Sequence, residues 1–335
     1  MASPSCTPLP LVVVLGLGGT IAAAATEAAE QTRYRAGALP VGQLLDSIAG
    51  CPLPPTWQIE AEQIAQIDSK DLAVGHWQSL LARVAQHLSR PEVRGLVITH
   101  GTDTLEETAY LLQRVFAPAR PVVLTAAMRP ATSLQADGPQ NLRDAITLAA
   151  HPQAHGVMTV LAGCALSGTE VRKVHGHRLD AFSGGDAGPI GRCINGLWQF
   201  YRAFPQGHPL WDRLGARLLA PGGDWPRVVQ LPSHAGLDPD LMGSMVDWLC
   251  TQGAAGFVIE GTGHATVHEA LEAALSPQRI GARPVWRSSR CVDGGIPDAL
   301  TPAQARIELM LQIMLRAHPA GSSQPTEARS MMDSP

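Results

Sequence analysis

The sequence predicts an α/β protein with a larger N-terminal domain, built on a doubly wound, mostly parallel sheet, and a smaller C-terminal α/β domain. Two observations lead to this fold class. Short, continuous apolar runs alternate with helical patterns, and parallel strands that are buried on both faces have such uninterrupted runs. A stretch rich in Pro and Gly at residues 203–226 then interrupts the pattern, which resumes on a smaller scale.

The N-terminal domain, residues 1–202, is predicted from apolar runs rich in Val and Leu. The expected strands are residues 11–16, 95–99, 121–125 and 156–161. The expected helices are residues 72–88, 105–116 and 141–150. Thr104 is a candidate N-cap for the second helix, and Glu107, three residues later, would complete a capping box.

The C-terminal half is expected to consist of a linker at 203–226, a domain at 227–318 and a disordered tail at 319–335 rich in Ser, Pro and Gly. In this domain each short strand pattern precedes a helix, which indicates βαβ units. The strand patterns are residues 228–231, 256–259 and 284–286, and the helices are residues 239–250, 267–275 and 302–317.

Composition restricts the class of partner. The chain has 335 residues, 45% of them hydrophobic, and a formal net charge of −4. This balance argues against binding to nucleic acid or to an anionic membrane, whereas a small zwitterionic ligand remains open. No histidine or cysteine spacing matches a metal motif, so we expect neither a metal nor a cofactor.

The cellular compartment is expected to be the cytoplasm. The six cysteines form no CxxC pair, which favours free thiols in a reducing compartment. The apolar run at residues 9–25 has no preceding Lys or Arg and is broken by glycines. It therefore matches neither a signal peptide nor a membrane span.

A glycine-rich turn follows the first predicted strand. In the dinucleotide motif G-x-G-x-x-G/A, counted from Gly16, the last position would be Ile21, whose branched side chain opposes close packing. The glycines would instead expose Thr20 at the carboxyl end of the strand, where ligands of open α/β sheets bind. Taken alone, this segment fits equally well with Thr20 only capping a turn.

A second polar cluster, residues 100–107, directly follows the strand at 95–99. Thr102 and Asp103 place a hydroxyl and a carboxylate at the start of a helix, whose free N–H groups can bind developing negative charge. A threonine hydroxyl needs a base to become a nucleophile, and Lys173 is a candidate. Lys173 considered alone would more simply be a solvated surface residue.

Four segments together resemble the bacterial-type L-asparaginase/glutaminase family. They are Gly-Gly-Thr-Ile-Ala at 18–22, His-Gly-Thr-Asp-Thr-Leu-Glu-Glu-Thr-Ala-Tyr at 100–110, Ala-Met-Arg-Pro at 127–130 and Ala-Asp-Gly-Pro-Gln-Asn-Leu at 136–142. The resemblance runs from about residue 11 to residue 317 and is thinner in the second domain. It implies hydrolysis of a small amino-acid amide, L-asparagine to L-aspartate and ammonia, by a ping-pong scheme without a cofactor.

The resemblance also implies catalytic roles. Thr20 would be the nucleophile that forms an acyl-enzyme, and Tyr34, on a loop after the first strand, would support it. Thr102, Asp103 and Lys173 would form a second triad, in which Asp103 also binds the substrate α-ammonium. The family further implies a homo-oligomer, either a dimer or a dimer of dimers, with sites at the dimer interface.

The expected substrate pocket departs from the family pattern. Ser69 would hold the α-carboxylate, with Asp68 and Lys70 beside it, but many members have Gln where Lys70 stands. A lysine aimed at the ammonium would repel it, and one aimed at the carboxylate would help. His264 stands where the family has an Asn supplied by a neighbouring subunit.

The loop after Arg290 is also short, and it lacks the ammonium-binding Glu of longer members, for which Asp293 is a weak substitute. We therefore expect retained amide chemistry with weakened amino-acid recognition. The alternatives are a glutaminase, an amidase with another substrate, and a catalytically silent homologue that binds an amino acid.

Overall fold

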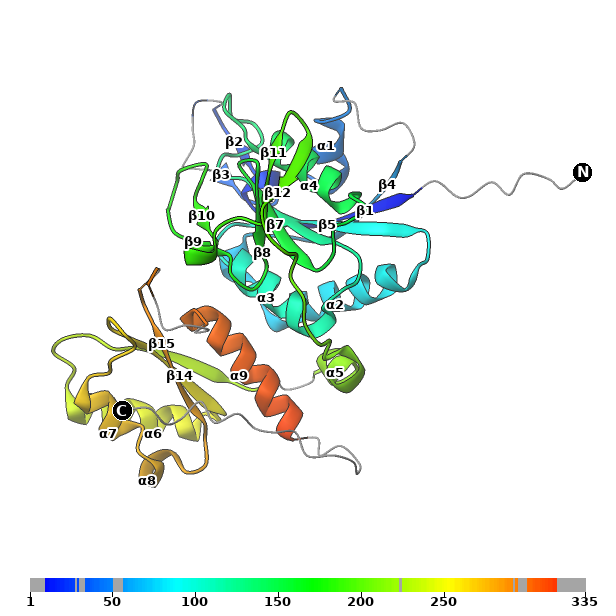
Figure 1. Ribbon diagram of the computed structural model, residues 1–335. Coiled ribbons are helices and arrows are strands. Elements are labelled where there is room, and N and C mark those ends of the chain that lie inside the picture. Colours follow the sequence, from blue (N-terminus) through cyan, green and yellow to red (C-terminus); the bar gives the residue numbers. More distant parts are fainter. Residues whose placement is uncertain are drawn as a thin grey trace, which may run out of the picture.

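The structure is a computed structural model (Figure 1), which describes residues 10–27, 29, 34–50, 57–222, 225–291, 293–294 and 300–317. The predicted tail at 319–335 lies outside these residues, as do Cys6 and Cys51. The four cysteines within them are free thiols. None of the described helices is long and apolar enough to span a membrane.

The larger sheet has eight strands, five of them parallel in the order β4-β1-β5-β6-β7. These are β1 (Leu11–Gly18), β4 (Gln58–Ile67), β5 (Val93–Thr99), β6 (Val122–Thr125) and β7 (Val157–Leu161). From β1 the chain continues to β4 on one side and then to β5 on the other. The strand order therefore reverses between β1 and β5, and such a switch point is where open α/β sheets bind ligands.

Helices cover both faces of this sheet, as the prediction of a doubly wound fold requires. One face packs on α2 (Val74–Ser89) and α3 (Leu105–Phe116), and the other on α1 (Val41–Asp46) and α4 (Gly138–Ala149). Every residue of β1 is buried, and its alternate side chains belong to the two opposite cores. This explains why β1 has an unbroken apolar sequence.

The far edge of the sheet is antiparallel and was not predicted. It consists of β8 (Cys164–Ser167), β11 (Gly191–Ile194) and β12 (Leu197–Phe200). Between β8 and β11 the chain forms the two-stranded sheet of β9 (Arg172–Lys173) and β10 (Phe182–Ser183) and the short helix η3 (Gly185–Ala187).

The smaller sheet is parallel, with the order β13-β14-β15, as the second alternating pattern predicted. Its strands are β13 (Val228–Pro232), β14 (Gly256–Gly261) and β15 (Val285–Ser289). Its helices are α6 (Pro239–Thr251), α7 (Glu269–Ala274), α8 (Pro277–Ile280) and α9 (Pro302–Arg316). The first three share a core with one face of this sheet, whereas α9 packs on the other face.

Helix α9 also contacts α3, so it lies between the smaller sheet and the helix layer of the larger one (Figure 1). Glu308 of α9 accepts hydrogen bonds from Arg114 Nε at 2.7 Å and from Tyr110 Oη at 3.2 Å. Arg306 of α9 forms an ion pair with Glu107 of α3. The smaller sheet is thus joined to the helix that begins directly after Thr104.

The predicted linker at 203–226 contains a helix, α5 (Trp211–Leu218). Its inner residues Leu214 and Leu218 are buried in the same core as α3 and α9. Because Pro and Gly residues surround this short amphipathic helix of about two turns, its sequence pattern was interpreted as a linker. The division into two domains joined by this linker stays a prediction.

Candidate active site

The loops after β1 and β5 touch each other backbone to backbone at the switch point. Gly19 has φ +78°, and a Cβ atom placed on it would lie 2.3 Å from Gly101 Cα. Gly18 has φ +105°, and its Cβ would lie 2.6 Å from the backbone of Ile67, at the end of β4. Because neither glycine has a side chain, the ends of three strands can converge here.

Ser69 connects the loop after β4 to the loop after β5. Its Oγ accepts a hydrogen bond from Asp103 N at 3.2 Å, and its carbonyl accepts one from Thr104 Oγ1 at 2.9 Å. A Cβ on Gly101 would lie 2.5 Å from Ser69 Oγ. Ser69, only 2% exposed, is therefore held tightly beside Asp103.

These contacts correct the predicted capping box. Thr104 precedes α3, but its side chain makes no capping hydrogen bond and instead binds the carbonyl of Ser69. Glu107 pairs with Arg306 of α9. Both side chains take tertiary partners in place of the local backbone groups, and a sequence pattern that considers only one helix cannot anticipate this.

Thr20 begins the short helix η1 (Thr20–Ala22) at the carboxyl end of β1, where the sequence placed it. Thr20 is 8% exposed, and its hydroxyl lies 3.0 Å from Tyr34 Oη. Tyr34 lies on β3 (Tyr34–Arg35), which pairs with β2 (Ala24–Ala25). The structure thus brings together the predicted nucleophile and its predicted supporting phenol.

The second predicted cluster is also assembled. Lys173, on β9, donates hydrogen bonds from Nζ to Thr102 Oγ1 at 2.8 Å and to Asp103 Oδ1 at 2.6 Å. The Lys173 side chain is 20% exposed, so this ion pair is not a fully solvated surface contact. Lys173 is 70 residues from Asp103 in the sequence, and only the fold brings the two together.

His100 is a buried residue whose role sequence reasoning missed. Its Nδ1 lies 2.7 Å from the carbonyl of Gly101, and its Nε2 lies 3.0 Å from Thr108 Oγ1. Burial lowers the pKa of His100 to about 4, so the ring is neutral near pH 7. Because a carbonyl only accepts, Nδ1 is assigned the proton, and the ring then orients the Gly101 peptide beside Thr102.

Lys70 and Asp68 flank Ser69 on η2 (Ser69–Asp71) and its N-cap. The Asp68 carboxylate accepts a hydrogen bond from Lys70 N at 3.4 Å. The exposed ammonium of Lys70 pairs with Asp71, and this contact raises the pKa of Lys70. The charge of Lys70 is thus directed to a neighbouring carboxylate, and its orientation toward a substrate stays a prediction.

His264 is not part of this cluster within one chain. It is exposed on the turn after β14, where Thr262 and Thr266 pair as an isolated bridge. Among the described residues, no hydrogen bond or ion pair joins His264 to Thr20 or Thr102. Asp293, the weak substitute for the missing Glu, is also exposed on the loop after β15.

A cavity of about 410 Å³ adjoins the Lys173–Asp103 pair, and Glu106 and His175 also line it. Within the described part of the chain, no three His, Cys, Asp or Glu side chains are grouped to hold a metal ion. The residues that meet at the switch point are instead hydroxyls, carboxylates and one ammonium, which suit proton transfer and acyl transfer.

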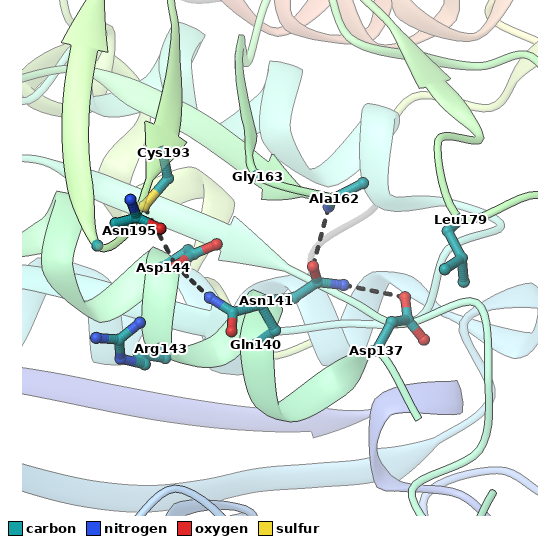
Figure 2. Close-up of a pocket in the computed structure, with 11 residues that line it drawn as sticks. Asp137, Gln140, Asn141, Arg143, Asp144, Ala162, Gly163, Leu179, Cys193 and Asn195 are labelled. Atoms are coloured by element: carbon teal, nitrogen blue, oxygen red, sulfur yellow. Dashed lines mark hydrogen bonds between the residues drawn. The ribbon is translucent and has the colours of Figure 1, made fainter. Parts of the chain in front are cut away.

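A larger cavity of about 510 Å³ lies over α4 and contains none of the residues at the switch point (Figure 2). Its lining explains the segments at 127–130 and 136–142. The Asp137 carboxylate accepts from Met128 N at 3.0 Å and from Asn141 Nδ2 at 3.0 Å, and Asn141 Oδ1 accepts from Ala162 N at 2.9 Å. These residues hold the loops after β6 and β7 in place.

Comparison with known proteins identifies the family. The family model described as "Asparaginase, N-terminal" matches residues 11–206. The chain is 33% identical to probable L-asparaginase 1 of Schizosaccharomyces pombe, over 91% of this chain and 85% of that protein. It is 32% identical to a glutaminase-asparaginase of Pseudomonas fluorescens biotype A, over 86% of this chain and 78% of that protein.

A solved structure shows the same fold. The crystal structure of a probable cytoplasmic L-asparaginase from Campylobacter jejuni superposes with a TM-score of 0.81 at 32% sequence identity. The match covers 91% of this chain and 95% of that one. The matched family model, the relatives and the shared architecture lead to one conclusion: this chain belongs to the bacterial-type L-asparaginase family of amidohydrolases.

Proposed function

We propose that the protein hydrolyses L-asparagine to L-aspartate and ammonia through an ester formed on Thr20. The observation that supports this most strongly is the meeting of two polar clusters at the switch point. In one cluster the Thr20 hydroxyl lies 3.0 Å from Tyr34 Oη. In the other, Lys173 binds both Thr102 and Asp103. The loop that carries Thr20 touches the loop that carries Thr102 and Asp103 through Gly19 and Gly101. Relatives named L-asparaginase, 32% to 33% identical, support the same activity.

In the proposed acylation step, Thr20 Oγ1 attacks the carbon of the side-chain amide. The hydroxyl proton leaves toward Tyr34 or toward the Thr102–Lys173 pair and is delivered to the amide nitrogen. The C–N bond then breaks, ammonia leaves, and an aspartyl ester remains on Thr20. Because Tyr34 orients the Thr20 hydroxyl, less conformational entropy is lost on reaching the transition state.

In the proposed deacylation step, water attacks the ester carbon. The water proton passes to the base, and the Thr20 oxygen takes a proton as the C–O bond breaks and aspartate leaves. Lys173 acts as the base only when it is uncharged, so Asp103 must exchange its partner from Lys173 to the substrate α-ammonium. The substrate ammonium thus takes the place of the lysine ammonium as the positive charge beside Asp103, which lets Lys173 be uncharged.

Ser69 and Asp103 are proposed to bind the two charged ends of the substrate. Ser69 Oγ already accepts a hydrogen bond from Asp103 N, so its own O–H is available to donate to an α-carboxylate. The Asp103 side chain is 49% exposed and can reach an ammonium. Asp68 and Lys70 lie beside this pocket, where the Lys70–Asp71 pair adds little net charge.

The assembly is proposed to be a homo-oligomer in which His264 of one copy completes the site of another. His264 is exposed and is separate from the Thr20 cluster within its own chain, as a residue donated to a neighbour would be. We further propose that the protein works in the cytoplasm, as the solved relative from Campylobacter jejuni is named.

Glutamine is the second candidate substrate, because one relative of 32% identity is named a glutaminase-asparaginase. Ammonia release from L-asparagine, L-glutamine and simple aliphatic amides separates the candidates. We expect asparagine to give the highest kcat/KM. No release from any amide, together with aspartate binding, would instead support a silent amino-acid-binding homologue.

The same assay tests whether amino-acid recognition is weakened. The sequence has no clear counterpart of the ammonium-binding Glu of longer family members, and the Lys70 ammonium pairs with Asp71. We therefore expect a KM for asparagine of roughly 0.1 mM or above, within the usual range for enzymes. A sub-micromolar KM would contradict weakened recognition while leaving the amide chemistry in place.

A further inference from the structure

Lys173 lies on a strand with little support from the large sheet. Strand β9 has only two residues, and it pairs with β10 alone. So short a ladder fixes a backbone poorly, yet Nζ of Lys173 must lie within hydrogen-bond distance of Thr102. A further contact is needed to hold the Lys173 backbone in register.

Glu106 provides that contact. Its Oε2 accepts a hydrogen bond from the Lys173 backbone N–H at 2.7 Å. Glu106 lies in the first turn of α3, three residues after Asp103. The start of α3 therefore holds Lys173 at two points, through Glu106 at the backbone and through Asp103 at the ammonium.

The surroundings of Glu106 fit a residue with a specific task. Burial raises the pKa of this carboxyl group, and the neighbouring Glu107 acts in the same direction. The Lys173 N–H and the positive charges of Arg172 and Lys173 act against that rise. Placing a carboxylate in such a position is costly unless its hydrogen bond is made, so Glu106 and the Lys173 backbone depend on each other.

The two adjacent carboxylates of the motif have different partners. Glu106 faces the 410 Å³ cavity with Asp103 and Lys173, whereas Glu107 turns to Arg306 of α9. Successive residues of an α-helix point about 100° apart around the axis. The first turn of α3 can therefore contact Lys173 through Glu106 and helix α9 through Glu107. Glu107 is therefore a natural control for Glu106.

We propose that Glu106 is a positioning residue, whose carboxylate holds the Lys173 backbone so that the lysine side chain reaches Thr102 and Asp103. This inference rests on the proposed function, in which Lys173 is the base. The Glu106 carboxylate contacts the Lys173 backbone, so its effect on the reaction is proposed to pass through Lys173.

Steady-state ammonia release by Glu106→Ala, Glu106→Gln and Glu107→Gln provides the first test. Glu106→Ala should lower kcat roughly 10- to 100-fold with KM changed less than about threefold, because a misplaced base slows chemistry more than binding. Glu106→Gln keeps an oxygen acceptor for the N–H and should restore kcat to within about threefold of wild type. Glu107→Gln should have near wild-type kcat.

A double-mutant cycle with Lys173→Met shows whether Glu106 acts through the lysine. If it does, Glu106→Ala in the Lys173→Met background should cost no further activity. An equal loss in both backgrounds, or a Lys173→Met protein with wild-type kcat, would overturn the proposal. So would a Glu106→Gln protein as slow as Glu106→Ala, provided that thermal unfolding shows both are folded.

Amide hydrogen exchange at Lys173 tests the contact without relying on activity. Exchange should be faster in Glu106→Ala than in wild type, and Glu106→Gln should remain protected. Unchanged exchange in Glu106→Ala would overturn the positioning role. If the three proteins show this order of exchange rates but wild type releases no ammonia from any amide, the proposed function is wrong while the Glu106 contact is supported.

Discussion

At the scale of single residues, the glycines at the switch point matter as much as the polar side chains. Gly19 lies so close to Gly101 that any side chain would collide with backbone, which cannot move away as a flexible side chain could. Its φ of +78° is also unfavourable for other residues. The distance between the two polar clusters is thus set by residues that have no functional groups.

Replacing Gly19 with Ala should therefore reduce both stability and activity. We expect a loss of about 1–2 kcal/mol or more in the free energy of unfolding, from the positive φ and the overlap, and a kcat lower by at least about tenfold. Urea unfolding and ammonia release measure the two effects.

Gly75→Ala is the matched control for this substitution. Gly75 lies in α2 and has nothing within 4 Å of its would-be Cβ, so alanine there should raise stability slightly or leave it unchanged. Equal behaviour of the two variants would contradict the close approach of the loops.

Sequence reasoning found three of the site residues because each follows a buried strand. Thr20, Thr102 and Asp103 could be placed at strand ends from the apolar runs before them, and the structure places them there. Their joint assembly with Lys173 and Tyr34 depends on long-range contacts. Lys173 was one candidate base from the sequence, whereas only the family resemblance suggested Tyr34. His100 was missed because a histidine within a polar motif gives no sign of its burial.

At the scale of elements, the strands of the larger sheet that sequence reasoning found are the ones buried on both faces. It missed β4, whose residues Gln58–Ile67 alternate Gln, Glu and apolar side chains, because β4 is the exposed edge of the sheet. The antiparallel strands β8, β11 and β12 are only four residues each and have no long apolar run. Edge and short strands depend on their partners more than on their own sequence.

The contact between α3 and α9 is the element-level link between the two sheets. Burial disfavours the ionised form of Glu308, but the hydrogen bond and charge of Arg114 outweigh this effect and lower the pKa of Glu308. Glu308 is only 7% exposed, so its removal would leave Arg114 and Tyr110 without their partner in a mostly buried interface.

We predict that Glu308→Ala lowers the free energy of unfolding by about 3–5 kcal/mol, the usual cost of breaking one side of a buried pair. Asp247→Ala is the control, because its pair with Arg279 is exposed and should contribute no more than about 1 kcal/mol. Chemical denaturation compares the two variants. Similar losses in both would show that the α3–α9 contact does not depend on this ion pair.

At the scale of the whole molecule, the residues proposed for the substrate pocket lie apart. The proposed catalytic groups lie at strand ends of the larger sheet, whereas His264 is exposed at the carboxyl end of β14 on the smaller one. Our proposal that a second copy supplies His264 makes oligomerisation a condition for full activity.

Mixing two inactive variants tests this arrangement. Thr20→Ala lacks the nucleophile and His264→Ala lacks the donated side chain, so a mixed dimer would contain one site with both changes and one site with neither. We expect subunit exchange between them to restore ammonia release to about a quarter or less of the wild-type rate. If His264→Ala is fully active, or if mixing restores nothing, the shared site is contradicted.

Thr20 is proposed to form the covalent bond to the substrate. Ammonia release from L-asparagine by Thr20→Ala, measured beside wild type and a Thr147→Ala control on α4, tests it most directly. We expect a fall in kcat of at least about a thousandfold in Thr20→Ala, since no other group replaces a missing nucleophile, and an unchanged rate in the control. A Thr20→Ala protein that releases ammonia at the wild-type rate would contradict it.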